Sequence, residues 1–282
     1  MSIPWADQPY ALLSTELPKG YGNASDGSIA VFTAMTLAHN MIIRHLNSIY
    51  LQATGVDSTT SEGDTRDFLF FCKTWLTELH GHHDGEESIL FPMLDEYTGV
   101  VGGAMGEAEA QHGTFRDGVD EMAAYIDHMS LTTTNLSEYS GIELRRIIRG
   151  FAPALMRHLR EEPGQLLAIG ERVGGVGLKR VWDDFEARLI REGMSKWDKH
   201  VMLPVVLGTN DHDFDGGAHA NFPPFPFFLP FLIRVYFAKR HAGAWRFFPC
   251  WNSRRRELAF VGEGWEDALD GEGEGEVEGE RR

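Results

Sequence analysis

Histidine and glutamate side chains recur at helical spacing in the first two-thirds of this 282-residue chain. Eight of its twelve histidines lie between positions 39 and 158. His82 and Glu86 are four residues apart, as are His158 and Glu162, and residues at this spacing share one face of a helix. Imidazole and carboxylate ligands without sulfur suit iron, manganese or zinc. The spacing therefore indicates metal chemistry inside a helical domain.

Four long segments show the apolar period of a helix that buries one face. Two of the connecting segments, residues 54–63 and 130–140, are polar and read as loops of about ten residues. This pattern predicts an all-α fold, an up-down four-helix bundle over residues 28–170. The predicted helices cover residues 28–53, 64 to about 91, 104–129 and 141–170.

Each predicted helix carries at least one polar side chain on its apolar stripe. Burial of one carboxylate without a partner is costly, and burial of two together costs more. Two metal cations would replace the lost hydration and favour the ionised carboxylates. A structural polar core is the alternative, but a histidine on each of four stripes favours a metal site. The stripes aim the following residues at one interior: His39, His82, Glu86, His112, His158 and Glu162.

The chain outside the bundle divides by composition. Residues 1–27 are punctuated by Pro and Gly and are expected to form an N-terminal arm. Residues 171–199 contain an additional helix at about 178–192. Residues 200–262 form an irregular extension rich in Phe and Pro, with one short helix near 232–240. This extension is expected to pack on the bundle, because apolar chain broken by prolines cannot bury itself; the alternative is that it lies on a membrane or a partner.

The composition is that of a soluble globular protein, with 43% hydrophobic and 24% charged residues. The formal net charge is −16, and an acidic chain repels phosphate backbones, so nucleic acid is not an expected partner. Part of this charge lies in a Gly/Glu-rich tail, residues 263–282, which is expected to be disordered. Cys72 and Cys250 form no disulfide or zinc pattern, which favours a cytoplasmic location. The chain shows neither a secretory signal nor an apolar run of about 18 residues, so no membrane span is expected.

Four motifs, taken in order, resemble the hemerythrin-like, or HHE cation-binding, family over about residues 28–169. They are AHNMIIR at 38–44, HHDGEESILFP at 82–92, QH at 111–112 and HLREE at 158–162. The resemblance implies a carboxylate-bridged centre of two non-haem iron ions, with manganese or zinc as alternatives. The C-terminal GAWRF at 243–247 and the Phe/Pro-rich runs also look like the extension of fungal members. Carried over, the resemblance makes His39, His82, His112 and His158 terminal ligands, and Glu86 and Glu162 bridges.

The second helix offers another pair, His83 and Glu87, which are also four residues apart. We prefer His82 and Glu86 because their separation in sequence from Phe91 and Pro92 resembles the spacing in the family. His83 would then lie behind the ligands or at the surface.

Two further positions bear on the site. Oxygen-carrying members of the family have a second histidine four residues after the ligand on the third helix, where this chain has Arg116, so one nitrogen ligand is missing. Pro163 directly follows Glu162 and removes a helix hydrogen bond. Glu161 is therefore an alternative ligand, or the helix bends there. Fewer protein ligands leave more open positions on the metal.

These features predict a di-iron binding protein that takes up oxygen, nitric oxide or iron itself for sensing, storage or detoxification. The expected partner is a small diatomic ligand or peroxide. Open metal positions also allow a di-iron oxidase or peroxidase with the same centre. A third hypothesis is an interaction module whose bundle keeps the metal for stability only.

Overall fold

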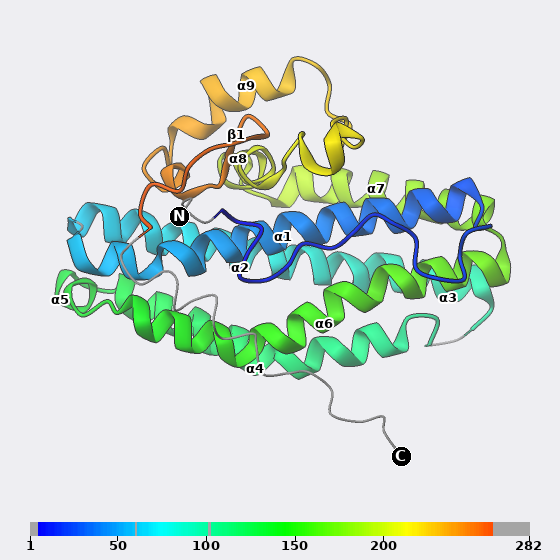
Figure 1. Cartoon of the computed structure of the whole chain (residues 1–282), viewed down its shortest axis with the longest axis horizontal. Coiled ribbons are helices and arrows are strands. Elements are labelled where there is room, and N and C mark those ends of the chain that lie inside the picture. Colours follow the sequence, from blue (N-terminus) through cyan, green and yellow to red (C-terminus); the bar gives the residue numbers. More distant parts are fainter. Residues whose placement is uncertain (1–4, 60, 101–102, 262–282) are drawn as a thin grey trace.

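The computed structural model describes residues 5–59, 61–100 and 103–261 (Figure 1). Four long helices form a ring in which each packs against the helices before and after it. The all-α bundle predicted from the sequence is confirmed. Its helices are α1 (Asp26–Thr59), α2 (Glu62–Gly85), α4 (Gly106–Ser130) and α6 (Gly141–Val173), and a short α5 (Thr133–Ser137) connects the last two.

The first connection is shorter than the sequence predicted. Val56 is buried and extends the apolar stripe of α1, so this helix continues past residue 53. Ser61 then starts α2 with a capping box, in which its hydroxyl accepts the Asp64 N–H and the Asp64 carboxylate accepts the Ser61 N–H. The loop predicted at 54–63 was therefore too long. Most of its residues are polar, and the buried Val56 is the residue that continues the helix.

A π-helical turn, η1 (Glu86–Leu90), separates α2 from the short helix α3 (Phe91–Thr98). The Phe91 N–H donates to the Glu86 carbonyl, as the wider turn requires. Pro92 falls in the first turn of α3, where its missing N–H costs little. The helix predicted to run to about residue 91 therefore changes type at Glu86, and single π turns often occur at functional sites.

Two apolar clusters fill the bundle, and a polar layer lies between them. The larger cluster, which includes Trp75, continues into the C-terminal extension. The smaller cluster, with Met35 and Leu166, fills the other end of the bundle. His39 lies along α1 between Met35 of the smaller cluster and Ile42 of the larger one. The predicted ligands therefore occupy the boundary between the two clusters.

The N-terminal arm runs along α1. The Asn40 side chain bonds both backbone groups of Leu13, and the Asn47 side chain does the same for Tyr10. Helix α7 (Gly175–Lys196) packs on α1 and α6 and is longer than the helix predicted at 178–192.

The C-terminal extension is more regular than the sequence predicted. Helix α8 (Lys199–Thr209) was missed because Pro204 lies inside its apolar run. Helix α9 (Leu229–Val235) lies earlier than the helix expected near 232–240, since Pro230 fits its first turn and Tyr236 leaves helical angles. Three 3-10 turns and a two-stranded antiparallel ladder complete it: η2 (Phe214–Gly217), η3 (Phe237–Lys239), η4 (Ala244–Phe247), β1 (Cys250–Trp251) and β2 (Arg254–Arg255).

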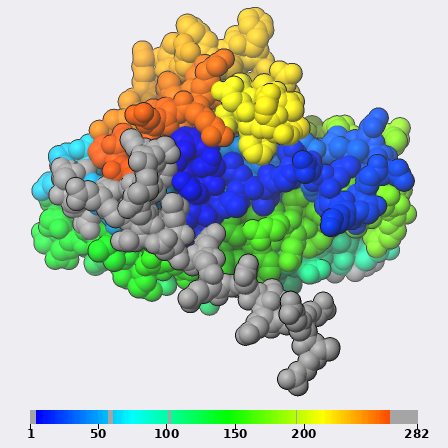
Figure 2. Space-filling model, viewed as in Figure 1, coloured from blue at the N-terminus to red at the C-terminus, as the bar shows by residue number. Residues whose placement is uncertain are grey.

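Figure 2 shows the extension, in yellow and orange, as a raised mass on one side of the bundle. Its Phe247 and Phe248 rings are buried against Phe71 of α2, with ring centroids 5.8 and 5.1 Å away. The acidic tail expected at 263–282 lies outside the described residues. Over the part of the chain that the structure describes, no helix is long and apolar enough to cross a bilayer.

Candidate metal centre

The polar layer contains two groups of side chains that share one carboxylate. In each group the potential ligand atoms all lie within 4.8 Å of one another. Glu86 belongs to both groups. All the residues that the sequence aimed at this interior meet here, and His83 joins them. The first group is His39, His82, Glu86 and Glu162, and the second is His83, Glu86, His112 and His158.

Glu86 faces both groups from the first residue of η1. Its Oε1 is 3.0 Å from His82 Nε2, and its Oε2 is 3.8 Å from His112 Nε2. His82 and His83 are neighbours on α2, where successive residues are about 100° apart. His82 can therefore point into one group and His83 into the other, and Glu86 lies between the two groups, where it could bridge two ions.

Glu162 faces both groups from α6. Its Oε2 is 3.3 Å from His39 Nε2 and 3.6 Å from His158 Nε2. Pro163 lies inside α6, and the helix continues through it. Because Pro163 has no N–H, the Leu159 carbonyl lacks its helical partner, and His39 Nδ1 donates to it at 2.8 Å. The proline next to Glu162 thus frees an acceptor that orients His39.

Hydrogen bonds at the outer ring nitrogens orient two more histidines. His112 Nδ1 donates to Glu87 at 2.6 Å, and His158 Nδ1 faces Gln111 Oε1 at 3.3 Å. Gln111 Nε2 in turn donates to Glu161 at 2.6 Å, so Glu87 and Glu161 stand behind the groups. A neutral imidazole carries one N–H, so the inner Nε2 atoms present lone pairs. These two Nε2 atoms are 3.2 Å apart, and a shared cation would remove the repulsion between their lone pairs.

The carboxylates of Glu86 and Glu162 are buried without ordinary hydrogen bonds. Their oxygens lie near imidazole nitrogens, yet none has a hydrogen-bond partner among the described residues. Burial, together with the charges of Glu162 and Glu87, raises the pKa of Glu86 well above its usual range. Burial also raises the pKa of Glu162 to about 7. Two carboxylates that resist ionisation alone, beside inward-facing lone pairs, fit a pair of bound cations.

The same layer favours the neutral form of four of its histidines. Burial, reinforced by neighbouring imidazoles, lowers the pKa of His39 and His83 well below the ordinary value. Burial also lowers the pKa of His158 to about 2 and lowers the pKa of His82. Neutral imidazole is the form that binds metals, so the layer prepares its nitrogens as ligands.

Both pairs offered by α2 contribute a histidine. His82 and Glu86, the preferred pair, lie in the first group. His83, expected behind the ligands or at the surface, is buried and belongs to the second group. It supplies the third imidazole of that group, whereas Arg116 is exposed on α4. The second helix therefore contributes an imidazole to this group, and the third helix contributes one, that of His112.

A cavity of about 280 Å³ lies between α2 and α4 beside the second group. His83 and His112 line it, together with the exposed side chains of His80 and Arg116. The residues that belong only to the first group do not line this cavity. A small molecule from solvent can therefore approach the second group by this route.

Comparisons with known proteins agree with this geometry. The family model described as the Hemerythrin HHE cation binding domain matches residues 30–169. The chain is also 36% identical over 259 residues, 91% of its length and 93% of the relative, to the dimeric xanthone biosynthesis cluster protein R11 of Cryptosporiopsis sp. (strain 8999). No solved structure matches significantly. The match to the family and the long similarity to this relative show that the chain belongs to the hemerythrin HHE cation-binding family.

Proposed function

We propose that this chain is a non-haem di-iron protein that binds oxygen, nitric oxide or iron itself in the cytoplasm, for sensing, storage or detoxification. One observation carries the proposal. Inward imidazole nitrogens and two carboxylates without hydrogen-bond partners converge on two points that share Glu86. Such an arrangement is costly for a protein interior alone, and two divalent cations would stabilise it.

The two ions would have unequal protein ligands. His39 and His82 would hold one ion, and His83, His112 and His158 would hold the other. Glu86 and Glu162 would bridge them. Bound iron would supply coordination positions for a small diatomic ligand or peroxide. The chain's own part is to orient the imidazoles, keep them neutral and leave an approach to the second group.

Metal analysis and spectroscopy test this function. Protein purified from its own organism should contain about two iron ions per chain, as expected for a dinuclear centre in a bundle. Anaerobic reduction followed by oxygen or nitric oxide should change the absorption spectrum reversibly. One ion at full occupancy, or manganese or zinc in place of iron, would contradict the di-iron proposal.

A di-iron oxidase or peroxidase is the second candidate function. The cavity beside the second group favours it, as does the name of the relative, which places that protein in a biosynthesis cluster. This chain would then carry out an oxidative step in a biosynthetic route. Irreversible oxidation with turnover of added peroxide would support the enzyme over the binding protein. Protein whose metal stabilises the fold but responds to neither oxygen, nitric oxide nor peroxide would instead support the interaction module.

A further inference from the structure

Helix α9 and its flanking residues expose large apolar side chains. Phe227 is 96% exposed and Phe231 is 61% exposed. Figure 1 shows α9 on the side of the extension that faces away from the bundle. Single exposed apolar residues are ordinary, but a contiguous group marks an interaction surface. We call the following residues the α9 face: Phe227, Phe228, Phe231, Leu232, Val235 and Tyr236.

Most of the α9 face lies along one side of α9, and this helix is apolar on two sides. Phe228, Phe231, Leu232 and Val235 recur three and four positions apart, so they share a side. Ile233 points the other way and is fully buried. Packing of α9 against the extension therefore already uses Ile233, and it does not account for the apolar residues on the outer side.

The chain around α9 is cationic, although the protein as a whole is acidic. Positions 216–256 contain seven Lys and Arg residues and no Asp or Glu, whereas the whole chain has a net charge of −16. Arg240, Arg246 and Arg255 form ion pairs with aspartates from outside this range, so the positive charge that is not paired comes from the other four. At physiological ionic strength, charges separated by more than about 8 Å are largely screened from one another. A partner at the α9 face therefore meets local positive charge, which suits an anionic surface.

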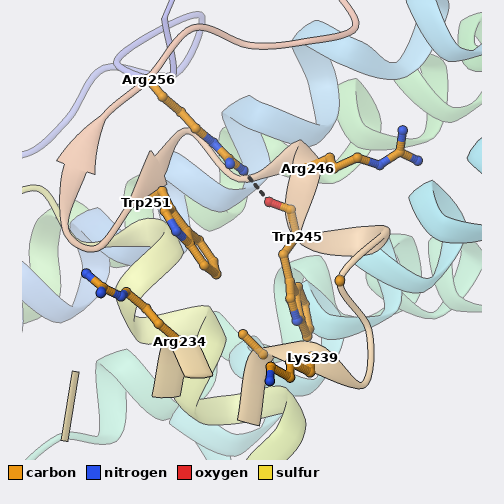
Figure 3. A pocket seen from close by; sticks show the side chains of 8 residues that line it. Arg234, Lys239, Trp245, Arg246, Trp251 and Arg256 are labelled. Atoms are coloured by element: carbon orange, nitrogen blue, oxygen red, sulfur yellow. Dashed lines mark hydrogen bonds between the residues drawn. The ribbon is translucent and has the colours of Figure 1, made fainter. Parts of the chain in front are cut away.

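A pocket of about 190 Å³ adjoins α9 (Figure 3). Trp245 and Trp251 are its aromatic residues, and Arg256 is engaged with backbone carbonyls of the extension. The side chains of Arg234 and Lys239 also line it and form no hydrogen bond or ion pair with any residue the structure describes. Two free cations beside aromatic rings provide a site for an anionic group at the edge of an apolar surface.

We propose that the α9 face docks on a bilayer that contains anionic phospholipids. Its aromatic and aliphatic side chains would enter the boundary between headgroups and acyl chains. Arg234 and Lys239 would contact the lipid phosphates. The proposal does not depend on the metal centre, so either one can fail without the other.

A bilayer fits this surface better than a second copy of the chain. In a two-fold dimer the same face would meet itself, so Arg234 and Lys239 of both copies would be brought into one interface. The extension projects from the bundle (Figure 2), and a fluid bilayer accepts protruding side chains without a matching groove.

Flotation of the full-length protein with phosphatidylcholine vesicles, with and without phosphatidylserine, tests the docking. We expect binding to the vesicles that contain phosphatidylserine, and we expect salt to weaken it. Each cation near such a surface contributes about fivefold in affinity, so Arg234→Ala with Lys239→Ala should weaken binding about 25-fold. Phe227→Ser with Phe231→Ser should weaken it about tenfold or more, because two apolar side chains no longer leave water.

Matched controls lie on α7. Ile190 is 60% exposed and Arg188 is also exposed, so Ile190→Ser and Arg188→Ala should leave vesicle binding unchanged. Equal binding by the wild type and the double Phe variant would overturn the proposal, as would binding that ignores phosphatidylserine. A wild-type dimer that dissociates on Phe231→Ser and binds no vesicles would assign the α9 face to self-association and also overturn it.

Discussion

The centre of the bundle and the α9 face each reverse the usual distribution of polar and apolar groups. The centre buries the carboxylates of Glu86 and Glu162 without hydrogen-bond partners. The α9 face exposes Phe227 and Phe231 to solvent. Buried polar groups and exposed apolar patches are the informative departures from ordinary folding. Each of the two regions therefore points to something that the chain binds.

The two regions differ in how their side chains are arranged. At the centre, atoms from different helices converge within 4.8 Å, and such a small enclosed space suits single ions. The side chains of the α9 face come from one short segment and enclose nothing, which suits an extended surface. Side chains that converge on one point thus mark a ligand site, and side chains spread along one surface mark a docking surface. Substitutions in the two regions should therefore have different consequences.

Glu86→Ala should have the largest effect, because Glu86 is the only residue common to both groups. We expect the metal content to fall from about two ions per chain to almost none, since Glu162 alone cannot neutralise two cations. Glu87→Ala is the matched control, because it removes only the partner of His112. It should lower affinity about tenfold to a hundredfold but keep both ions in excess metal. Elemental analysis showing the reverse pattern would make Glu87 the ligand.

His83→Ala should weaken the binding of one ion and spare the other. The second group would keep two imidazoles, whereas His83 has no place in the first group. At limiting metal we expect the content to fall from about two ions towards one, because the second ion loses one of its three imidazoles. His80→Ala tests the same cavity without touching either group and should leave the content unchanged. Equal affinity for both ions in the wild type and the His83→Ala protein would contradict the role of His83.

Helical periodicity was enough to bring six of these residues together, because side-chain direction along a helix depends only on position. It was not enough for His83. For a single centre the two pairs on α2 are alternatives, whereas two groups side by side can use the adjacent residues His82 and His83. The change to a π turn at Glu86 was not predicted either, because no local pattern distinguishes it from an ordinary helix.

Phe248→Ala should strongly lower the free energy of unfolding, because part of the extension belongs to the hydrophobic core. Phe248 is fully buried and its ring contacts Phe71 and His45. Truncation of such a residue typically costs about 3–5 kcal/mol of unfolding free energy. Phe231→Ala, on the exposed α9 face, should change it by less than about 0.5 kcal/mol. Denaturant unfolding of both variants measures the difference, and equal losses would mean that the α9 face is packed in the folded chain.

The sequence could not separate these two parts of the extension. Both are rich in Phe, and both were grouped with the apolar chain expected to cover the bundle. Burial of Phe247 and Phe248 depends on α1 and α2, which are distant in sequence, so no local period reports it. Helix α8 was hidden for a local reason, since Pro204 interrupts its apolar run.

Glu162→Gln should have the smallest effect and one that depends on pH. In the metal-free protein burial raises the pKa of Glu162 to about 7 from 4.5. The folded state then holds a proton that the unfolded state has lost, so stability falls as pH rises from 4.5 through 7. Gln cannot ionise and avoids this loss. We expect the metal-free variant to match the wild type near pH 4.5 and to exceed it by up to about 3 kcal/mol at pH 8.

With metal bound, the wild type should be more stable than Glu162→Gln, because a bound cation stabilises the ionised carboxylate that Gln lacks. Thermal melts of wild type and Glu162→Gln, each with chelator and with metal across this pH range, measure both differences. If the stability difference between the two proteins in chelator does not change with pH, Glu162 is already ionised in the empty centre. The carboxylate would then have a partner other than a metal, and the strongest physical contrast between the bundle centre and an ordinary polar core would be lost.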